Sequence, residues 1–97
     1  MKILALEHEL PDATAEQFGQ YANDEARKAW ELHQAGIIRE LYFRADRNEA
    51  VLVLDCASVS EAQEILAALP FVKAGLITFE VIPLKAYPGF ARLFEKD

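Results

Sequence analysis

Apolar residues recur along the chain with two different periods, and the changes between these periods predict the secondary structure. Alternating or continuous apolar positions predict strands over Ile3–Glu9, Ile37–Arg44, Ala50–Cys56 and Leu76–Leu84. Apolar positions that repeat every three or four residues predict one helix between the first two strands and another between the last two. The resulting order, β-α-β-β-α-β, is that of a ferredoxin-like α+β fold with an antiparallel sheet and two helices on one face.

Capping signals mark the ends of the two predicted helices. The segment from Thr14 to Gln17 has the spacing of a capping box, so the first helix should start near Ala15. Gly36 should end this helix, because glycine adopts a left-handed conformation without a steric penalty. The segment from Ser58 to Glu61 is a second capping box, and its helix should end at Pro70.

Two polar residues interrupt the apolar face of the first predicted helix. Glu25 falls between the directions of Phe18 and Leu32, and His33 also projects within this face. A polar group on a buried face needs a partner, because burial without a hydrogen bond is costly. Both residues are therefore candidates for function. His33 would act as a donor or proton shuttle near neutral pH, or would be a core histidine with a satisfied ring.

The amount of apolar surface predicts self-association of one domain, residues 1–97. Hydrophobic residues make up 53% of the chain, and the strands are apolar on both faces, whereas two helices cover only one face of a sheet. We expect an identical sheet to cover the other face, which gives a homodimer or a higher homo-oligomer. The C-terminal tail, residues 85–97, carries Phe90, Leu93 and Phe94 at helical spacing. It would clasp the partner subunit or fold back on its own sheet.

Charge and composition exclude several classes of partner. A net charge of -6 without a basic stripe argues against binding to nucleic acid. No apolar run approaches the roughly 20 residues that span a bilayer, and the N-terminus lacks the order of a signal peptide. We therefore expect no membrane partner and a soluble, cytoplasmic protein. Cys56 cannot form an internal disulfide, since it is the one cysteine, and it is interpreted as a small core residue.

Short motifs follow one another in a characteristic order over residues 24–84. They are Asp24-Glu25, Leu32, Gly36, Arg39, Leu41, Asp55, Ser58-Val59 and Leu69-Pro70. In this order and spacing the chain resembles the muconolactone isomerase-like members of the dimeric α+β barrel superfamily. The resemblance implies isomerisation of a small unsaturated lactone acid by proton transfer, without a metal or an organic cofactor. The chain departs from the family in the second strand, where Ile38 and Glu40 replace aromatic and histidine character, and this bears on the substrate.

Proton transfer next to a lactone carbonyl needs a base and a positive group that faces the enolate oxygen. Glu25 is the candidate base, since desolvation on an apolar face raises the pKa of a carboxyl. Strict alternation places Arg39 under the helices together with Ile37, Leu41 and Phe43. Arg39 would then face Glu25 and stabilise the enolate or the substrate anion. The alternative is a buried ion pair between Glu25 and Arg39 without activity.

The other side of the second strand offers a different pocket. The same alternation places Ile38, Glu40, Tyr42 and Arg44 there. If the pocket opens between subunits, Glu40 and Tyr42 would bind substrate together with His8 from the first strand. The alternative is a hydrogen-bond network at the interface. His8 and His33 lie on different elements without metal-ligand spacing, so no metal site is expected.

Three functions are consistent with these residues. The first is a cofactor-independent, homodimeric enzyme that isomerises a small lactone or enol-type metabolite. The second is a cofactor-free monooxygenase, an activity that the same superfamily also contains. The third is a dimeric protein that binds a small ligand without catalysis, in which Glu25 has no chemical role.

Overall fold

Four strands form one antiparallel sheet in the computed structural model, which describes residues 1–95. The strands are β1 (Lys2–Glu9), β2 (Ile38–Phe43), β3 (Ala50–Asp55) and β4 (Ile77–Pro83). Their order across the sheet is β2-β3-β1-β4, and each neighbouring pair is antiparallel. Each strand boundary lies within one residue of the prediction. The predicted ferredoxin-like α+β sheet is confirmed.

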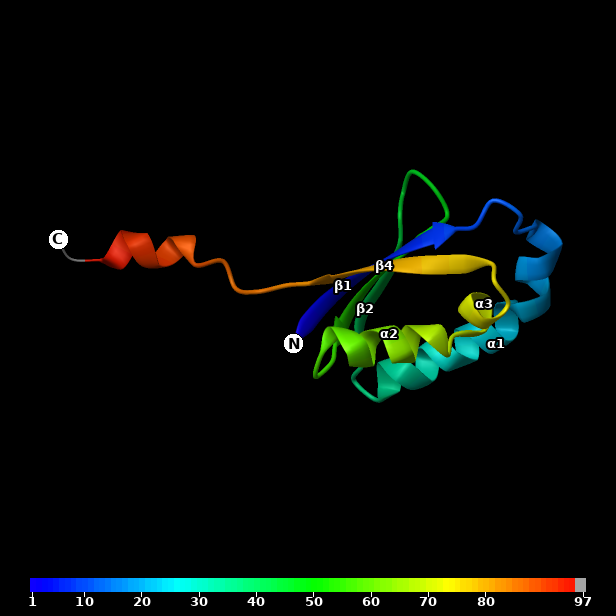
Figure 1. The fold of residues 1–97 in the computed structure, drawn as a ribbon, viewed down its shortest axis with the longest axis horizontal. Coiled ribbons are helices and arrows are strands. Elements are labelled where there is room, and N and C mark those ends of the chain that lie inside the picture. Colours follow the sequence, from blue (N-terminus) through cyan, green and yellow to red (C-terminus); the bar gives the residue numbers. More distant parts are fainter. Residues whose placement is uncertain (96–97) are drawn as a thin grey trace.

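The helices lie together on one face of this sheet (Figure 1). They are α1 (Ala15–Gln34), α2 (Val59–Ala67) and the single turn α3 (Pro70–Lys73). The predicted end of the second helix at Pro70 is wrong. α2 ends at Ala67, and Pro70 instead opens α3, because proline suits the first turn of a helix, where its missing N–H is not needed. Within residues 1–95, no helix has the length and apolarity needed to cross a membrane.

The predicted caps fix the ends of α1. The Thr14 hydroxyl accepts a 3.2 Å hydrogen bond from the Gln17 amide, and the Gln17 side chain accepts one of 2.9 Å from the Thr14 amide. At the other end, Gly36 adopts a φ of 80°, the left-handed conformation that reverses the chain into β2. Both features were predicted, because each is encoded by residues adjacent to the helix end.

The core fills the space between the helices and the sheet. It is built from alternate residues of the strands and from the inward faces of α1 and α2, and it includes Cys56 as predicted. Its largest fully buried side chains are Ile3, Ile38 and Leu54 in the sheet, together with Leu69 before α3 and Leu76 before β4. Glu7 is the buried charged residue of this layer.

A β-bulge interrupts β2 at Arg39. Ile38 pairs with Leu54 and Glu40 pairs with Val53, so Arg39 is an extra residue without a partner position on β3. The bulge turns Ile38 into the core and leaves Arg39 exposed. The strict alternation predicted for this strand, with Arg39 under the helices and Ile38 on the opposite side, is therefore wrong.

The second face of the sheet carries no helix (Figure 1). Apolar side chains at its centre are half-buried: Leu4, Leu6, Val51, Val53 and Ile82. The tail after β4 extends away from the sheet and ends in a short 3-10 helix, Gly89–Phe94, so the alternative in which it folds back is wrong. Residues 96–97 of the predicted tail lie outside the described part of the chain. The pairing of two sheets stays a prediction.

Candidate active site

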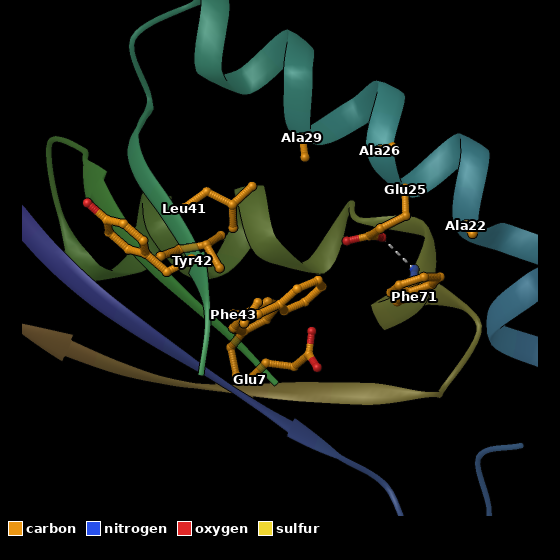
Figure 2. Close-up of a pocket in the computed structure, with 12 residues that line it drawn as sticks. Glu7, Ala22, Glu25, Ala26, Ala29, Leu41, Tyr42, Phe43 and Phe71 are labelled. Atoms are coloured by element: carbon orange, nitrogen blue, oxygen red, sulfur yellow. Dashed lines mark hydrogen bonds between the residues drawn. The ribbon is translucent and has the colours of Figure 1, made fainter. Parts of the chain in front are cut away.

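A cavity of about 460 Å³ lies between α1 and the β2 side of the sheet. α1 lines it with Ala22, Ala26 and Ala29, whose methyl groups are too short to fill the gap between helix and sheet (Figure 2). β2 lines it with Leu41 and Phe43. Because β2 is an edge strand, these two side chains remain exposed and the cavity lies at the border of the sheet.

Glu25 enters the cavity from α1 (Figure 2). Its side chain is half-buried, and Oε1 accepts a 2.9 Å hydrogen bond from the backbone amide of Phe71 in α3. The apolar helical face that singled out Glu25 in the sequence is the wall of this cavity. Its role as a base stays a prediction.

Glu7 enters the same cavity from β1, and the sequence analysis did not select it. Its exposed fraction is 9%, the lowest of the charged residues described. A signal was nevertheless present. Ile3, Ala5 and Glu7 alternate along one strand, so a face that buries the first two must also bury the third.

Burial raises the pKa of both carboxyls. The pKa of Glu7 rises from its ordinary value of 4.5 to about 7, mainly because of burial, although the backbone amide of Ala50 opposes the rise. Neighbouring carboxylates add to this rise, in decreasing order Glu49, Glu25 and Glu9. Burial also raises the pKa of Glu25, while the hydrogen bond from Phe71 favours its ionised form and limits the change. Two carboxyls with different proton affinities therefore share one apolar cavity.

Arg39 and His33 lie in a second cavity of about 470 Å³ on the outer side of the junction between α1 and β2. Arg39 is exposed, as expected for the extra residue of a bulge. The two cavities adjoin, because four residues line both of them: Ala26, Ala29, Leu41 and Tyr42. A ligand in the first cavity could therefore extend toward the guanidinium group.

The predicted contact between Glu25 and Arg39 is not formed. Glu25 lines the first cavity and is bonded to Phe71, whereas Arg39 lines the second. Within residues 1–95 no ion pair joins the two side chains, so the alternative of a buried ion pair is wrong as well. The physical reason is the bulge, which moves Arg39 out of the layer beneath α1.

His33 is held by the chain reversal that follows α1. Its Nδ1 lies 3.0 Å from the carbonyl oxygen of Ile38. A carbonyl can only accept a hydrogen bond, so Nδ1 carries the hydrogen and Nε2 is the acceptor nitrogen of the neutral ring. The ring also lies against Trp30, with a centroid distance of 5.7 Å. His33 is thus a satisfied histidine, but at an exposed position and not in the core.

The register directs the remaining predicted residues toward the face of the sheet without helices, although at the edge of the sheet Tyr42 also lines both cavities and Glu40 lines the second. The Tyr42 hydroxyl donates a 2.8 Å hydrogen bond to Glu40 Oε1 on β2. His8 Nε2 lies 3.5 Å from Glu80 Oε1 on the β1–β4 side. These are two separate exposed pairs, with β3 between their strands. Binding of substrate by this group stays a prediction. Within residues 1–95, no three His, Cys, Asp or Glu side chains cluster as metal ligands would.

The sheet with helices on one face defines a ferredoxin-like α+β protein, and two carboxyl groups line its cavity under α1. The sequence model of the muconolactone delta-isomerase family matches residues 4–89, which is most of the chain. The chain therefore belongs to this family, as its motifs indicated.

Solved structures show the same architecture. A crystal structure of muconolactone isomerase is 27% identical, with a TM-score of 0.75, over 91% of this chain and 92% of that chain. The 5-chloro-2-hydroxyhydroquinone dehydrochlorinase of Burkholderia phenoliruptrix AC1100, solved with 2,5-dihydroxybenzoquinone, has a TM-score of 0.63 over 92% of this chain and 98% of that chain. Its identity is 18%, so this likeness shows the fold alone. No match was found among curated proteins.

Proposed function

We propose that the protein isomerises a small unsaturated lactone acid by proton transfer, without a metal or an organic cofactor. Membership of the muconolactone delta-isomerase family supports this class of reaction. The observation that carries the proposal is the position of Glu25, a carboxyl on the wall of an otherwise largely apolar cavity. The size of this cavity, about 460 Å³, suits a small metabolite.

Glu25 acts as the base in this proposal. A carbon next to an unsaturated lactone carbonyl holds an acidic proton, because the resulting charge spreads onto the carbonyl oxygen as an enolate. Burial raises the pKa of Glu25 and so makes its carboxylate a better base for this proton. The hydrogen bond from Phe71 engages Oε1 and fixes the orientation of the group. A fixed carboxylate can meet the reacting carbon without a search among rotamers.

Arg39 binds the carboxylate group of the substrate. The chain has a net charge of -6 and two acids in the first cavity, so an anionic substrate needs a local positive charge. The Arg39 guanidinium lies in the adjoining cavity and can bind a carboxylate with two parallel hydrogen bonds. A substrate across the shared wall would place its ring beside Glu25 and its acid group beside Arg39.

The test is turnover of unsaturated lactone acids, followed by ultraviolet absorbance and by NMR of the product. Wild-type protein should move the double bond, and the Glu25→Gln variant should lose about 100-fold or more in kcat, the usual contribution of a general base. Glu64→Gln is the matched control, because Glu64 is an exposed carboxyl on α2, away from both cavities. It should retain wild-type activity.

One result would overturn the proposal in favour of a binding protein. Calorimetry would then find lactone acids bound equally well by wild-type and Glu25→Gln protein, while neither protein converts them. Circular dichroism of each variant would exclude loss of the fold as the cause.

A further inference from the structure

Two carboxyl groups face one cavity from opposite walls. Glu25 extends from α1 and Glu7 extends from β1, toward the same space beside Phe43 (Figure 2). They are the only charged side chains among the twelve described residues that line the cavity. A buried carboxyl that pairs with no cation needs an explanation, because its charged form is poorly solvated. A site that transfers protons in both directions gives one.

We infer that Glu7 is a second acid–base residue of this cavity, a carboxylic acid that protonates one substrate carbon while Glu25 deprotonates another. This inference rests on the proposed function. It assigns the role of base to Glu25 and the role of acid to Glu7, because the two carboxyls have different surroundings.

The hydrogen bonds and the burial favour this division of roles. Glu25 accepts the Phe71 amide, a bond that stabilises the carboxylate form. Glu7 is the more deeply buried group and has a pKa of about 7, so it keeps its proton to a higher pH. The charged groups around it are carboxylates from three parts of the fold, which oppose its ionisation: Glu9 on β1, Glu25 on α1 and Glu49 before β3. The backbone amide of Ala50 acts in the opposite sense.

The reaction balances with these two groups alone. The Glu25 carboxylate takes a proton from carbon; that C–H bond breaks, and its electron pair delocalises over the unsaturated carbonyl as an enolate. The Glu7 O–H bond then breaks as its proton forms a new C–H bond at the far end of the conjugated system. The double bond has moved, Glu25 is protonated and Glu7 is ionised. A proton passed from Glu25 to Glu7 through water restores the starting state.

Glu7 also has a route for exchanging this proton. A further cavity of about 420 Å³ lies toward the N-terminal end of α1, and Glu7 lines it as well as the first cavity. The two cavities share three more residues: Ala22, Phe43 and Phe71. While a substrate occupies the first cavity, Glu7 can thus still exchange its proton with water in the second one.

The activity test compares Glu7→Gln with wild-type protein and with the control Glu64→Gln. At pH 7 we expect Glu7→Gln to lose about 100-fold in kcat with little change in KM, because glutamine fills the site but cannot donate a proton to carbon. Wild-type kcat/KM should fall above about pH 7 as Glu7 ionises, and Glu7→Gln should lack this fall. A Glu7→Gln variant with wild-type kcat and the same alkaline fall would overturn the inference.

A second measurement does not depend on turnover. In protein with carbon-13 at its glutamate carboxyls, the Glu7 resonance should titrate near pH 7, and Glu25→Gln should lower its pKa by removing a neighbouring negative charge. A Glu7 that titrates near 4.5, or that does not respond to Glu25→Gln, would overturn the inference. If wild-type protein converts no lactone acid, the proposed function fails, and the titration still decides whether the two carboxyls are coupled.

Discussion

The carboxylate of Glu25 accepts a 2.9 Å hydrogen bond from the backbone amide of Phe71. The two residues lie on α1 and α3, so this bond ties two helices together at the cavity wall. The Phe71 ring strengthens the same junction by packing edge-on against Phe18, with a centroid distance of 5.1 Å. A group proposed as a base is thus oriented by a backbone donor, which no substitution short of proline removes.

The buried carboxyl of Glu7 should make the protein less stable as the pH rises. Its pKa is higher in the folded chain, so the folded state binds the proton more tightly. Its contribution to stability is complete below about pH 4.5 and is lost as the pH rises to about 7. The free energy of unfolding should fall by roughly 3 kcal/mol at most over this range. Glu7→Gln should be more stable than wild type at pH 8, as measured by urea denaturation.

The control is urea denaturation of wild type, Glu7→Gln and Glu64→Gln at pH 5 and at pH 8. Glu64→Gln carries the same change of net charge at an exposed position and should follow wild-type behaviour at both values. If Glu7→Gln and Glu64→Gln shift the urea midpoint equally at pH 8, the destabilisation does not arise from burial of Glu7.

Arg39 should determine the affinity for the acid group of the substrate. Arg39→Ala is expected to raise KM for lactone acids about tenfold or more, since a hydrogen-bonded charge pair is lost, and to change kcat little. Steady-state kinetics with the methyl ester of the same substrate provide the control, because the ester lacks the anionic group. An equal rise of KM for acid and ester would contradict binding of the carboxylate by Arg39.

Gly36 should be required for the passage from α1 to β2. Gly36→Ala forces a Cβ into a conformation with a φ of 80° and should destabilise the fold by about 1 kcal/mol. Gly19→Ala is the opposite case, because Gly19 lies inside α1 and an added Cβ meets no atom within 4 Å. It should stabilise by roughly 0.5–1 kcal/mol. Urea denaturation of both variants measures the contrast, and equal effects would contradict it.

Self-association should be detectable by sedimentation at micromolar concentration. The sheet face without helices is apolar at its centre, and the tail exposes large side chains, including Phe90 at 66% and Phe94 at 81%. Both surfaces would be covered in a dimer. Deletion of residues 85–97 should weaken the dimer relative to the full chain at the same concentration. Wild-type protein that sediments as single protomers would contradict the expected pairing.

The sequence predicted the elements of the fold because their signals are local. The capping box at Thr14 and the glycine at position 36 each act within a few residues, and the structure shows both. The bulge at Arg39 is different, since it exists only in the pairing of β2 with β3. A strand read alone has no bulge, so alternation placed Arg39 on the wrong side.

Of the two carboxyls that line the cavity, the sequence analysis selected Glu25 and missed Glu7. Glu25 was found because a charge on an apolar helical face is conspicuous in a long helix. Glu7 follows the same logic on β1, but Glu7, His8 and Glu9 together end this strand with polar residues, which resembles the strand's exit to solvent. The alternation of Ile3, Ala5 and Glu7 pointed to burial, and the register shows it, because Glu7 pairs with Phe79 and is buried on the same face as Ala5.

The small residues of α1 set the shape of the cavity, whereas other residues carry its reactive groups. Ala22, Ala26 and Ala29 stand on successive turns of the helix and carry no reactive group. Exchange of any one of them for valine or leucine would narrow one part of the cavity without changing Glu7 or Glu25. Under the proposed function, preference for one substrate over another could therefore be changed at these three positions of α1.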